Sequence, residues 1–533
     1  MYDAVKQNVA GADIKRAVSF YGKKYTFDAI FRYIDTLAEN LKEKYGLGKG
    51  DTLTLCMPNS PSALITFYAA NKLGAAVNLA HPYIPPEKLK ESAEKTDSKI
   101  VVVYDAYPHK VRPDFKAVLL ESDCGYFMGA AAKAYYRLTK KKLGWGESLE
   151  KLIRRGKKSF SAPAKFGFGE PAVYLASGGT TGEPKMIMHN NYTFNLLCSK
   201  APEFLRYDVS EYASLYNVLP IFHGFGLCIN MHMCMMIRRT NIMCIKFDAG
   251  RSAKQIIKEK ANILTGVPTM FLKLLGEKRF VNGDLSNIKD AFVGGDSVSP
   301  KLVEDFNAVL KKNGSPARLY EGYGLTETVT VCVVNSAAHN KNGSLGYPLS
   351  GTEIRIVKDG SFLPCGEVGE IYLHTPQFML GYMTGENPFE EIDGVRWLKT
   401  GDYGWLDEDG FLYFKQRIKN MIKVSGVPVY PSEIEGVAMK AEGVKKACAV
   451  GVKDSVRGQH VRLYLETEGD AEAVKARVSA LCKAQLLAYA VPKEIVVKEK
   501  LPVNLIGKID RKAIEEEAVS YTHLRAHETR RHL

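Results

Sequence analysis

The sequence predicts an α/β fold, in which a large N-terminal domain of two α/β subdomains plus a β subdomain precedes a small mobile α+β C-terminal domain. Strand-like and helix-like segments alternate in two successive blocks. Short strands with Asp-Gly turns follow, and mixed strands and helices return after Arg417. We therefore expect domains at residues 1–416, with the β subdomain at about 343–414, and at 417–520, with the boundary near Lys419.

The first block opens with a helical pattern over residues 26–45. A strand at 52–57, a helix at 61–73 and a strand near 99–104 follow it. The second block repeats this alternation, with strand-like segments at 172–175, 212–219, 241–247, 263–267 and 288–293. Two α/β subdomains are therefore expected.

The remaining elements are shorter. Strands at 352–358 and 370–374 are separated from their neighbours by Asp-Gly pairs, which favour tight hairpin turns. These pairs stand at 359–360, 393–394 and 409–410. The C-terminal segment shows strands at 446–452 and 461–466 and a helix at 471–487.

The composition is that of a folded protein of several domains. Of its 533 residues, 46% are hydrophobic and 25% are charged, which is enough apolar surface for a core. Lys and Arg outnumber Asp and Glu by 73 to 59, giving a net charge of +14. This charge suits phosphate-rich ligands, nucleic acid or an anionic membrane. Nucleic acid is disfavoured, because the basic residues are dispersed and no groove-reading module is present.

Ten cysteines without a Cys-x-x-Cys pair, and no secretory leader, predict a reducing, cytoplasmic location. The longest apolar run, 227–237, contains Asn230 and His232 and falls well short of the about 20 residues of a membrane span. Residues 133–158 carry ten Lys and Arg around Trp145. We interpret them as a solvated connector, with peripheral contact to an anionic membrane as the alternative.

The last residues, 521–533, differ from the rest of the chain. They combine His523, His527 and His532 with three arginines and show no apolar periodicity. We interpret them as a non-native tail and exclude them from the fold prediction.

The strongest motif is a loop after the strand at 172–175, which reads Ser177-Gly178-Gly179-Thr180-Thr181-Gly182-Glu183-Pro184-Lys185. Glycines let backbone N–H groups approach phosphate oxygens, threonines add hydroxyls, and Lys185 adds a positive charge. Because ligands bind at strand exits in α/β sheets, this loop predicts a phosphate site. It lacks the Walker pattern, which disfavours a P-loop NTPase.

A second motif reads Tyr320-Glu321-Gly322-Tyr323-Gly324-Leu325-Thr326-Glu327-Thr328. Tyr323 can stack on a base, and Glu327 can bind Mg²⁺, which takes one or two carboxylates together with phosphate oxygens.

Two other functions are excluded. A G-x-G-x-x-A match at 167–172 precedes its strand, which argues against a dinucleotide site, and no G-x-S-x-G marks a hydrolase nucleophile.

With four further segments, these motifs resemble the adenylate-forming superfamily, specifically the acyl-CoA synthetases, in order and approximate spacing over nearly the whole chain. The further segments are 220–226, 397–402, 417–435 and 507–511. The resemblance implies an ATP-dependent acid–thiol ligase of fatty acid metabolism that uses ATP, Mg²⁺ and CoA. A carboxylic acid, with a fatty acid as the expected class, becomes acyl-AMP with release of pyrophosphate. CoA then takes the acyl group and AMP leaves.

The resemblance also implies the nucleotide-binding residues, which are Gly179, Thr180, Thr181, Gly182, Lys185, Gly294, Gly295, Glu321, Tyr323, Thr326, Asp402, Arg417 and Lys508. Within this set, Thr180, Thr181, Gly182 and Lys185 would hold the β- and γ-phosphates. Gly294, Gly295, Glu321 and Tyr323 would surround adenine. Asp402 and Arg417 would bind the ribose hydroxyls. Glu327 would bind magnesium.

The implied catalytic residues are Lys508, Glu327, His223 and Lys185. Lys508 would bridge the acid carboxylate and the α-phosphate, where a positioned ammonium stabilises the transition state. His223 would line the carboxylate pocket, with a purely structural role as the alternative. Lys419 would be the hinge of the C-terminal domain, and Ser425 and Gly426 would face the CoA thiol.

Three positions depart from the family's pattern, namely Met186, Asp296 and Gln416. Asp296 puts the choice of acid in doubt. Two alternative functions stay open: an adenylating enzyme that loads an acyl carrier protein, and a non-catalytic nucleotide-binding regulatory protein. The presence of Lys508, Glu327 and Lys185 argues against the second.

Overall fold

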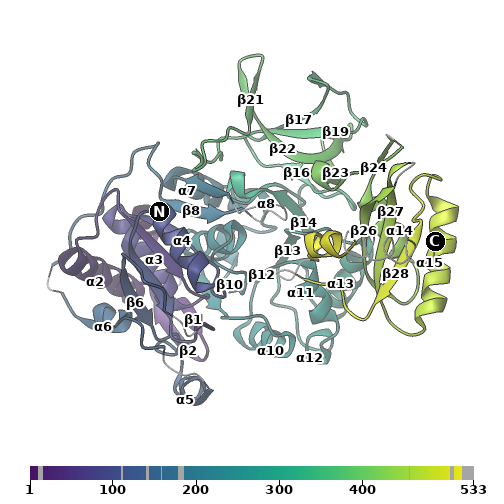
Figure 1. Cartoon of the computed structure of the whole chain (residues 1–533). Helices are drawn as coiled ribbons and strands as arrows, with labels where there is room; N and C mark the ends of the chain where they lie inside the picture. Colours follow the sequence, from purple (N-terminus) through teal and green to yellow (C-terminus); the bar gives the residue numbers. More distant parts are fainter. Residues whose placement is uncertain are drawn as a thin grey trace, which may run out of the picture. The chain divides into compact units, whose positions relative to one another are not determined.

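The computed structural model describes residues 1–9, 16–109, 112–139, 143–157, 159–177, 185–425, 427–454, 457–503 and 509–518. These residues form two compact units, whose elements are labelled in Figure 1. Among the described residues, unit 1 comprises those up to 353 together with 374–387. Unit 2 comprises 354–373 and those from 388 onward.

The first large sheet of unit 1 has, within the described residues, eight strands in the order β20-β9-β8-β4-β3-β5-β6-β7. Strands β8 to β7 along this order are parallel, whereas β9 is antiparallel to both β8 and β20. The strands are β3 (Thr52–Cys56), β4 (Ala76–Leu79), β5 (Ser98–Tyr104), β6 (Val118–Ser122), β7 (Glu147–Ser148), β8 (Val173–Ala176), β9 (Met186–His189) and β20 (Gly381–Tyr382).

The helices that accompany this sheet are α1 (Tyr2–Val9), α2 (Phe27–Tyr45), α3 (Pro61–Leu73), α4 (Pro86–Lys95), α5 (Ala130–Thr139) and α6 (Leu149–Arg154). Capping residues mark both ends of α2 and of α3. The Thr26 side chain accepts a hydrogen bond from the N–H of Ala29, and Gly46 ends α2 at φ 63°. Ser60 and Gly74 bound α3 in the same way. The helices predicted at 26–45 and 61–73 are thus confirmed.

The second sheet of unit 1 has nine strands in the described residues, in the order β16-β15-β14-β13-β12-β10-β11-β1-β2. Its central strands from β1 to β14 are parallel, and antiparallel strands flank them. The strands are β1 (Arg16–Phe20), β2 (Lys23–Thr26), β10 (Ser214–Asn217), β11 (Thr240–Met243), β12 (Ile263–Gly266), β13 (Asp290–Gly294), β14 (Leu319–Gly324), β15 (Val331–Val334) and β16 (Tyr347–Pro348).

Helices pack against this sheet around one buried apolar core, which includes Phe271, Phe280 and Phe306 (Figure 1). The helices in this part of the chain are α7 (Asn191–Ser199), α8 (Ala201–Phe204), η1 (Val209–Glu211), η2 (Phe225–Met233), α9 (Cys234–Met236), α10 (Ala249–Glu259), α11 (Pro268–Leu275), α12 (Lys278–Val281), α13 (Pro300–Lys312) and η3 (Thr326–Thr328). The segment after His223 is a π-helix, η2. π-Helical turns are frequent at functional sites.

Unit 2 contains two smaller sheets. The six-stranded sheet of its described residues has the order β18-β17-β19-β22-β21, with β23 paired to β22. Its strands are β17 (Glu353–Lys358), β18 (Ser361–Phe362), β19 (Gly369–His374), β21 (Phe389–Ile392), β22 (Val395–Leu406) and β23 (Leu412–Arg417). Asp359, Gly360, Asp393 and Gly394 all have positive φ, which confirms the tight turns expected at these Asp-Gly pairs.

The C-terminal sheet, five-stranded in the described residues, has the order β25-β24-β27-β26, with β28 parallel to β27. Its core holds Ile434, Leu463 and Val478, each fully buried. The elements are η4 (Ile418–Asn420), β24 (Ile422–Val424), β25 (Val427–Val429), α14 (Pro431–Ala438), β26 (Val444–Asp454), β27 (Gly458–Thr467), α15 (Ala471–Gln485) and β28 (Glu494–Lys498). Residues 511–518 are also helical. The α/β class and the small α+β C-terminal region are thus confirmed.

Within the described part of the chain, no helix combines the length and the apolar character that crossing a membrane requires.

Candidate active site

The two ends of the glycine- and threonine-rich loop meet at the base of the β8–β9 hairpin. The Ser177 N–H donates to the Lys185 carbonyl at 2.8 Å, and the Lys185 N–H donates to Ser177 Oγ at 3.0 Å. The chain therefore leaves the sheet and returns to it at one point, with Lys185 at the return. The predicted phosphate contacts Gly179, Thr180, Thr181 and Gly182 lie outside the described residues.

Lys185 and Glu327, predicted from separate motifs, meet around one tyrosine. The Tyr382 hydroxyl donates to Glu327 Oε1 at 2.7 Å. Lys185 Nζ lies 4.8 Å from the centre of the Tyr382 ring and also forms an ion pair with Glu386. Burial raises the pKa of Tyr382, which keeps its hydroxyl protonated as a donor. A cation, a donor and a carboxylate thus share one region, as a metal-bound polyphosphate requires.

Strand β20 brings Tyr382 to this place. It pairs with β9, with Tyr382 opposite Ile187, and the Leu380 N–H donates to the Met188 carbonyl at 2.8 Å. The Met379 N–H donates to the Glu327 carbonyl, also at 2.8 Å. The segment before β20 is therefore hydrogen-bonded on one side to the strand that follows Lys185 and on the other to η3.

A buried histidine also joins β9 to η3. His189 Nε2 lies 2.7 Å from the Thr326 carbonyl and donates to it. Burial lowers the pKa of His189 to about 4, so the ring is neutral near pH 7. The predicted site residue Thr326 is thus held through its backbone, which fixes the start of the turn that carries Glu327.

The predicted adenine residues lie on two adjacent parallel strands, β13 and β14. Gly294 pairs with Gly322, and a Cβ on Gly294 would lie 2.8 Å from the Gly322 carbonyl oxygen. Gly295 has φ +81°, which favours glycine. Glu321 and Tyr323 both belong to β14. Burial raises the pKa of Glu321 to about 8. The strand pairing therefore brings these predicted residues together.

The predicted ribose residues form an ion pair in unit 2. Asp402 on β22 stands opposite Arg417 on β23, and Arg417 Nε lies 3.3 Å from Asp402 Oδ1. Asp402 is 2% exposed, whereas the Arg417 side chain is 43% exposed. Thr400 Oγ1 accepts a hydrogen bond from the Asp402 N–H at 3.1 Å. The carboxylate is therefore paired with a residue of the neighbouring strand, and the preceding turn holds the backbone of Asp402.

His223 lies in a loop that another part of unit 1 anchors. Asn59, which is 2% exposed, donates from Nδ2 to the Leu219 carbonyl at 2.8 Å. Asn59 Oδ1 accepts from the Ile221 N–H at 3.0 Å. The Leu227 N–H donates to the His223 carbonyl at 2.9 Å, which joins the loop to η2. One buried amide therefore fixes the chain just before His223.

The remaining predicted residues belong to the C-terminal region. Lys508 and Gly426 lie outside the described residues. Val503 and Ile509 form an antiparallel bridge. Lys419 lies in η4, and Ser425, at φ 52°, forms the turn between β24 and β25.

Sequence reasoning missed four residues of this site, namely Asn59, His189, Tyr382 and Glu386. None stands in a motif with a chemical pattern of its own. The Glu327–Tyr382 bond joins residues 55 positions apart, which the pairing of β20 with β9 and the bond from Met379 to Glu327 bring together. Tyr382 and Glu386 fall within the β subdomain expected at about 343–414, whereas the structure places this segment in unit 1, where β20 pairs with β9.

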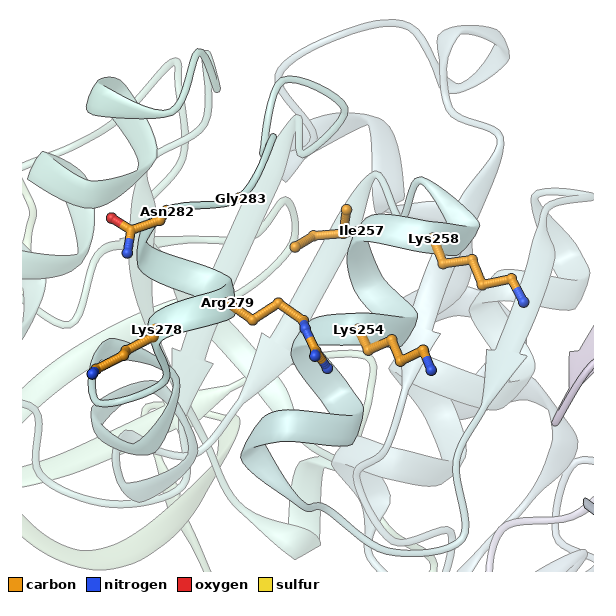
Figure 2. Close-up of a pocket in the computed structure, with 7 residues that line it drawn as sticks. All are labelled: Lys254, Ile257, Lys258, Lys278, Arg279, Asn282 and Gly283. Carbon is orange, nitrogen blue, oxygen red and sulfur yellow. The ribbon is translucent and has the colours of Figure 1, made fainter.

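No group of three or more His, Cys, Asp or Glu side chains is placed to hold a metal ion within the described residues. An open pocket of about 590 Å³ lies elsewhere in unit 1, between α10 and α12 (Figure 2). It is lined by Lys254, Ile257, Lys258, Lys278, Arg279, Asn282 and Gly283, none of which is a predicted site residue.

Two families match the chain: AMP-binding enzyme over residues 5–383, and AMP-binding enzyme C-terminal domain over residues 433–508. A long-chain-fatty-acid–CoA ligase of Bacillus subtilis (strain 168) is 29% identical over 96% of this chain and 93% of its own length. One from Escherichia coli O6:H1 is 30% identical over 97% and 94%. A 2-succinylbenzoate–CoA ligase of a Geobacillus species is 26% identical over 93% of both chains.

Solved structures share the fold. An anthranilate CoA ligase in complex with anthranoyl-AMP superposes with a TM-score of 0.84, 20% identity and 98% coverage of both chains. The o-succinylbenzoate coenzyme A synthetase of Bacillus subtilis, in complex with ATP and a magnesium ion, has a TM-score of 0.78, 24% identity and coverage of 96% and 98%. The family matches span most of the chain, and the relatives align along nearly all of it. The chain therefore belongs to the AMP-binding enzyme family, in which it is an AMP-forming acid–CoA ligase.

Proposed function

We propose that this ligase activates a fatty acid, first as acyl-AMP and then as acyl-CoA. The observation that carries the proposal is the meeting of Lys185, Tyr382 and Glu327 beside the loop between β8 and β9. A fatty acid is the proposed substrate because the relatives at 29% and 30% identity are named long-chain-fatty-acid–CoA ligases. The relative named for 2-succinylbenzoate is less similar, at 26%.

In this proposal ATP binds through the predicted residues. Thr180, Thr181, Gly182 and Lys185 hold the β- and γ-phosphates, with Gly179 giving the backbone room to approach. Gly294, Gly295, Glu321 and Tyr323 surround adenine, and Thr326 belongs to the same nucleotide-binding set. Asp402 accepts hydrogen bonds from the ribose hydroxyls, with Arg417 beside it.

The residues present fit a magnesium ion that arrives with ATP. The Tyr382 hydroxyl donates to Oε1 of Glu327, and in the proposal the other carboxylate oxygen, Oε2, would bind the cation. A single carboxylate is enough, because Mg²⁺ completes its shell with phosphate oxygens and water. When bound, the ion neutralises charge on the phosphates.

The chemistry then follows in two steps. A carboxylate oxygen of the acid attacks the α-phosphorus, the bond to the bridging oxygen breaks, and pyrophosphate leaves with the electron pair. Lys508 holds the two anions together and stabilises the charge that redistributes between them. The CoA sulfur, having lost its proton to solvent, attacks the acyl carbonyl carbon, and AMP leaves with the electron pair of the broken acyl–oxygen bond.

The C-terminal residues would serve the second step. Lys419 is proposed as the hinge and the Ser425-Gly426 turn as the part that faces the CoA thiol. Ser425 sits at the tip of the β24–β25 hairpin, where its N–H donates to the Arg457 carbonyl at 2.7 Å. A short hairpin held in this way can present backbone N–H groups to a ligand.

The test is incubation with MgATP, CoA and acids from acetate to palmitate and benzoate, with pyrophosphate and acyl-CoA measured for each. We expect long-chain acids to give both products. Lys508→Ala should abolish pyrophosphate release yet still convert supplied acyl-AMP to acyl-CoA, whereas Lys500→Ala, a control lysine of the same region, should resemble the wild type.

The other outcomes favour different functions. If acyl-CoA forms only with benzoate or only with acetate, the proposed fatty-acid substrate is wrong, but the proposed two-step mechanism is supported. Pyrophosphate release without acyl-CoA would point to loading of an acyl carrier protein. A Lys508→Ala variant with wild-type adenylation would overturn the role of that lysine.

We also propose a reducing, cytoplasmic location. All ten cysteines are free thiols, and only Cys365 is exposed.

Peripheral membrane contact is the accompanying proposal, supported by α5, where Tyr135 is 60% and Leu138 86% exposed beside Arg137. Sedimentation with anionic vesicles, but not with neutral ones, is the expected result, and Leu138→Asp should remove it.

A further inference from the structure

A strained turn follows Glu327 directly. Val329 has φ 68° and ψ −56°, and the Thr330 N–H donates to the Thr328 carbonyl at 2.8 Å. Together these define a γ-turn of the rare hand, with a positive φ at its centre. A β-branched residue disfavours this conformation most, and Val329 is 1% exposed. Strain of this kind persists only where the surroundings hold it, and it concentrates at functional sites.

Hydrogen bonds on both sides of Val329 hold the turn. Its N–H donates to the Thr326 carbonyl at 3.0 Å. Thr328 Oγ1 lies 3.1 Å from the Leu325 carbonyl oxygen and 3.0 Å from that of Thr330. The same short segment therefore sets the position of Glu327 and the direction of the Val329 carbonyl.

That carbonyl lies against the loop of His223. A Cβ on Gly224 would be only 1.7 Å from the Val329 oxygen, so the two backbones touch and glycine is required there. The opposite end of this loop is anchored by Asn59 through Leu219 and Ile221. These hydrogen bonds of Asn59 go to the chain before His223 and not to the turn at Val329. The loop is thus held at two points, and only one of them is next to Glu327.

We propose that Val329 is a positioning residue that couples the Glu327 carboxylate to the His223 loop, so that the metal site and the acid site keep one geometry. The inference rests on the proposed roles of Glu327 and His223. If the turn relaxed to an ordinary conformation, the Val329 carbonyl would rotate away from Gly224 and Glu327 would shift with it. Asn59 positions the same loop independently of Glu327.

The test compares Val329→Gly with Val329→Ala. Both remove the buried side chain, but only glycine frees the backbone, because alanine also disfavours positive φ. In pyrophosphate-release assays we expect Val329→Gly to raise both the magnesium half-saturation and the KM for the acid by about fivefold. Val329→Ala should lower the melting temperature and leave both constants near the wild type.

Asn59→Asp serves as the matched comparison, since it keeps shape and removes the amide donor. It should raise the KM for the acid without changing the magnesium dependence. Equal constants for Val329→Gly and Val329→Ala, or a Val329→Gly effect on only one of the two constants, would overturn the coupling.

Glu327→Gln separates this inference from the function on which it rests. If Glu327→Gln keeps wild-type magnesium dependence, the metal role of Glu327 fails and the coupling fails with it. If Glu327→Gln weakens magnesium use and Val329→Gly does not, only the coupling is overturned.

Discussion

At the scale of single residues, the Glu327 carboxylate depends on Tyr382. Tyr382→Phe removes the donor to Oε1 and leaves the ring beside Lys185. A hydrogen bond to a charged group contributes about 1.5–3 kcal/mol. We therefore expect the magnesium concentration for half-maximal pyrophosphate release to rise about tenfold or more.

The matched control is Tyr372→Phe, because the Tyr372 hydroxyl also donates to a glutamate, Glu390, at 2.9 Å. It removes an equivalent bond from a pair that contains no predicted site residue. Its magnesium dependence should equal that of the wild type. A similar change in magnesium dependence in both variants would mean that the Tyr382→Phe effect does not depend on the bond to Glu327 in particular.

Glu321 makes stability depend on pH. Burial raises its pKa from 4.5 to about 8, so the folded state favours the protonated carboxyl. Below pH 4.5 the carboxyl is protonated in both the folded and the unfolded state, and its contribution to the free energy of unfolding is complete. As the pH rises from 4.5 to 8, the unfolded state loses the proton first, and the free energy of unfolding falls by up to about 1.4 kcal/mol per pH unit. Glu321→Gln cannot ionise, so its melting temperature relative to the wild type should rise between pH 5 and pH 9. A difference that is constant over this range would contradict the buried position of the carboxyl.

Some residues of the site can be predicted from the sequence, and others cannot. Lys185, Glu327 and Asp402 stand in local motifs whose chemistry is visible in a few neighbouring letters, and the sequence predicts them. Tyr382 on β20 and His189 on β9 act through contacts with η3, which is far from both in the chain. Their neighbours carry no chemical pattern, so only the tertiary structure reveals their role.

At the scale of elements, a buried ion pair joins the first three helices. Lys72 on α3 is 2% exposed and lies 2.8 Å from Asp35 on α2, which also accepts from the Tyr2 hydroxyl of α1. Burial opposes the ionisation of Asp35, but hydrogen bonds from Lys72 and Tyr2 hold its pKa below the usual value.

Lys72→Met leaves this carboxylate without its buried partner. We expect the free energy of unfolding, from urea titration, to fall by about 3–5 kcal/mol. Lys72→Met with Asp35→Asn removes both charges and should recover most of the loss. If the double variant is less stable than Lys72→Met alone, the loss of stability in Lys72→Met does not come from breaking the charge pair.

Elements with capping residues were the most predictable. The predicted helix 61–73 agrees with α3 at both ends, because Ser60, Pro61 and Gly74 mark them. The π-helix η2 was not predicted, since an apolar run has the same pattern in an α-helix and in a π-helix. The two-residue strands β16 and β20 were also missed, because so few residues carry no periodicity.

At the scale of the whole molecule, each unit has a core of its own. Leu264 of unit 1 and Leu463 of unit 2 are both almost fully buried. Replacing either by alanine should cost about 2–5 kcal/mol. Trp145 reports on unit 1, whereas Trp397 and Trp405 report on unit 2.

We expect Leu264→Ala to shift mainly the unfolding transition seen by Trp145, in a background with Trp397→Phe and Trp405→Phe. Leu463→Ala should shift mainly the transition seen by Trp397 and Trp405 in a Trp145→Phe background. If both substitutions shift both transitions equally, the two units unfold as one cooperative block.

The pairing of β20 with β9 has a consequence for the growing chain. Strand β9 is complete by residue 189, but its outer neighbour is synthesised only at residues 381–382. Until then the backbone of β9 presents an open edge, which is a template for pairing with other chains. A ribosome that stalls between these points would release a fragment prone to aggregate, and the same late strand delivers Tyr382 to Glu327. Closure of the edge and delivery of Tyr382 to Glu327 are one event in synthesis.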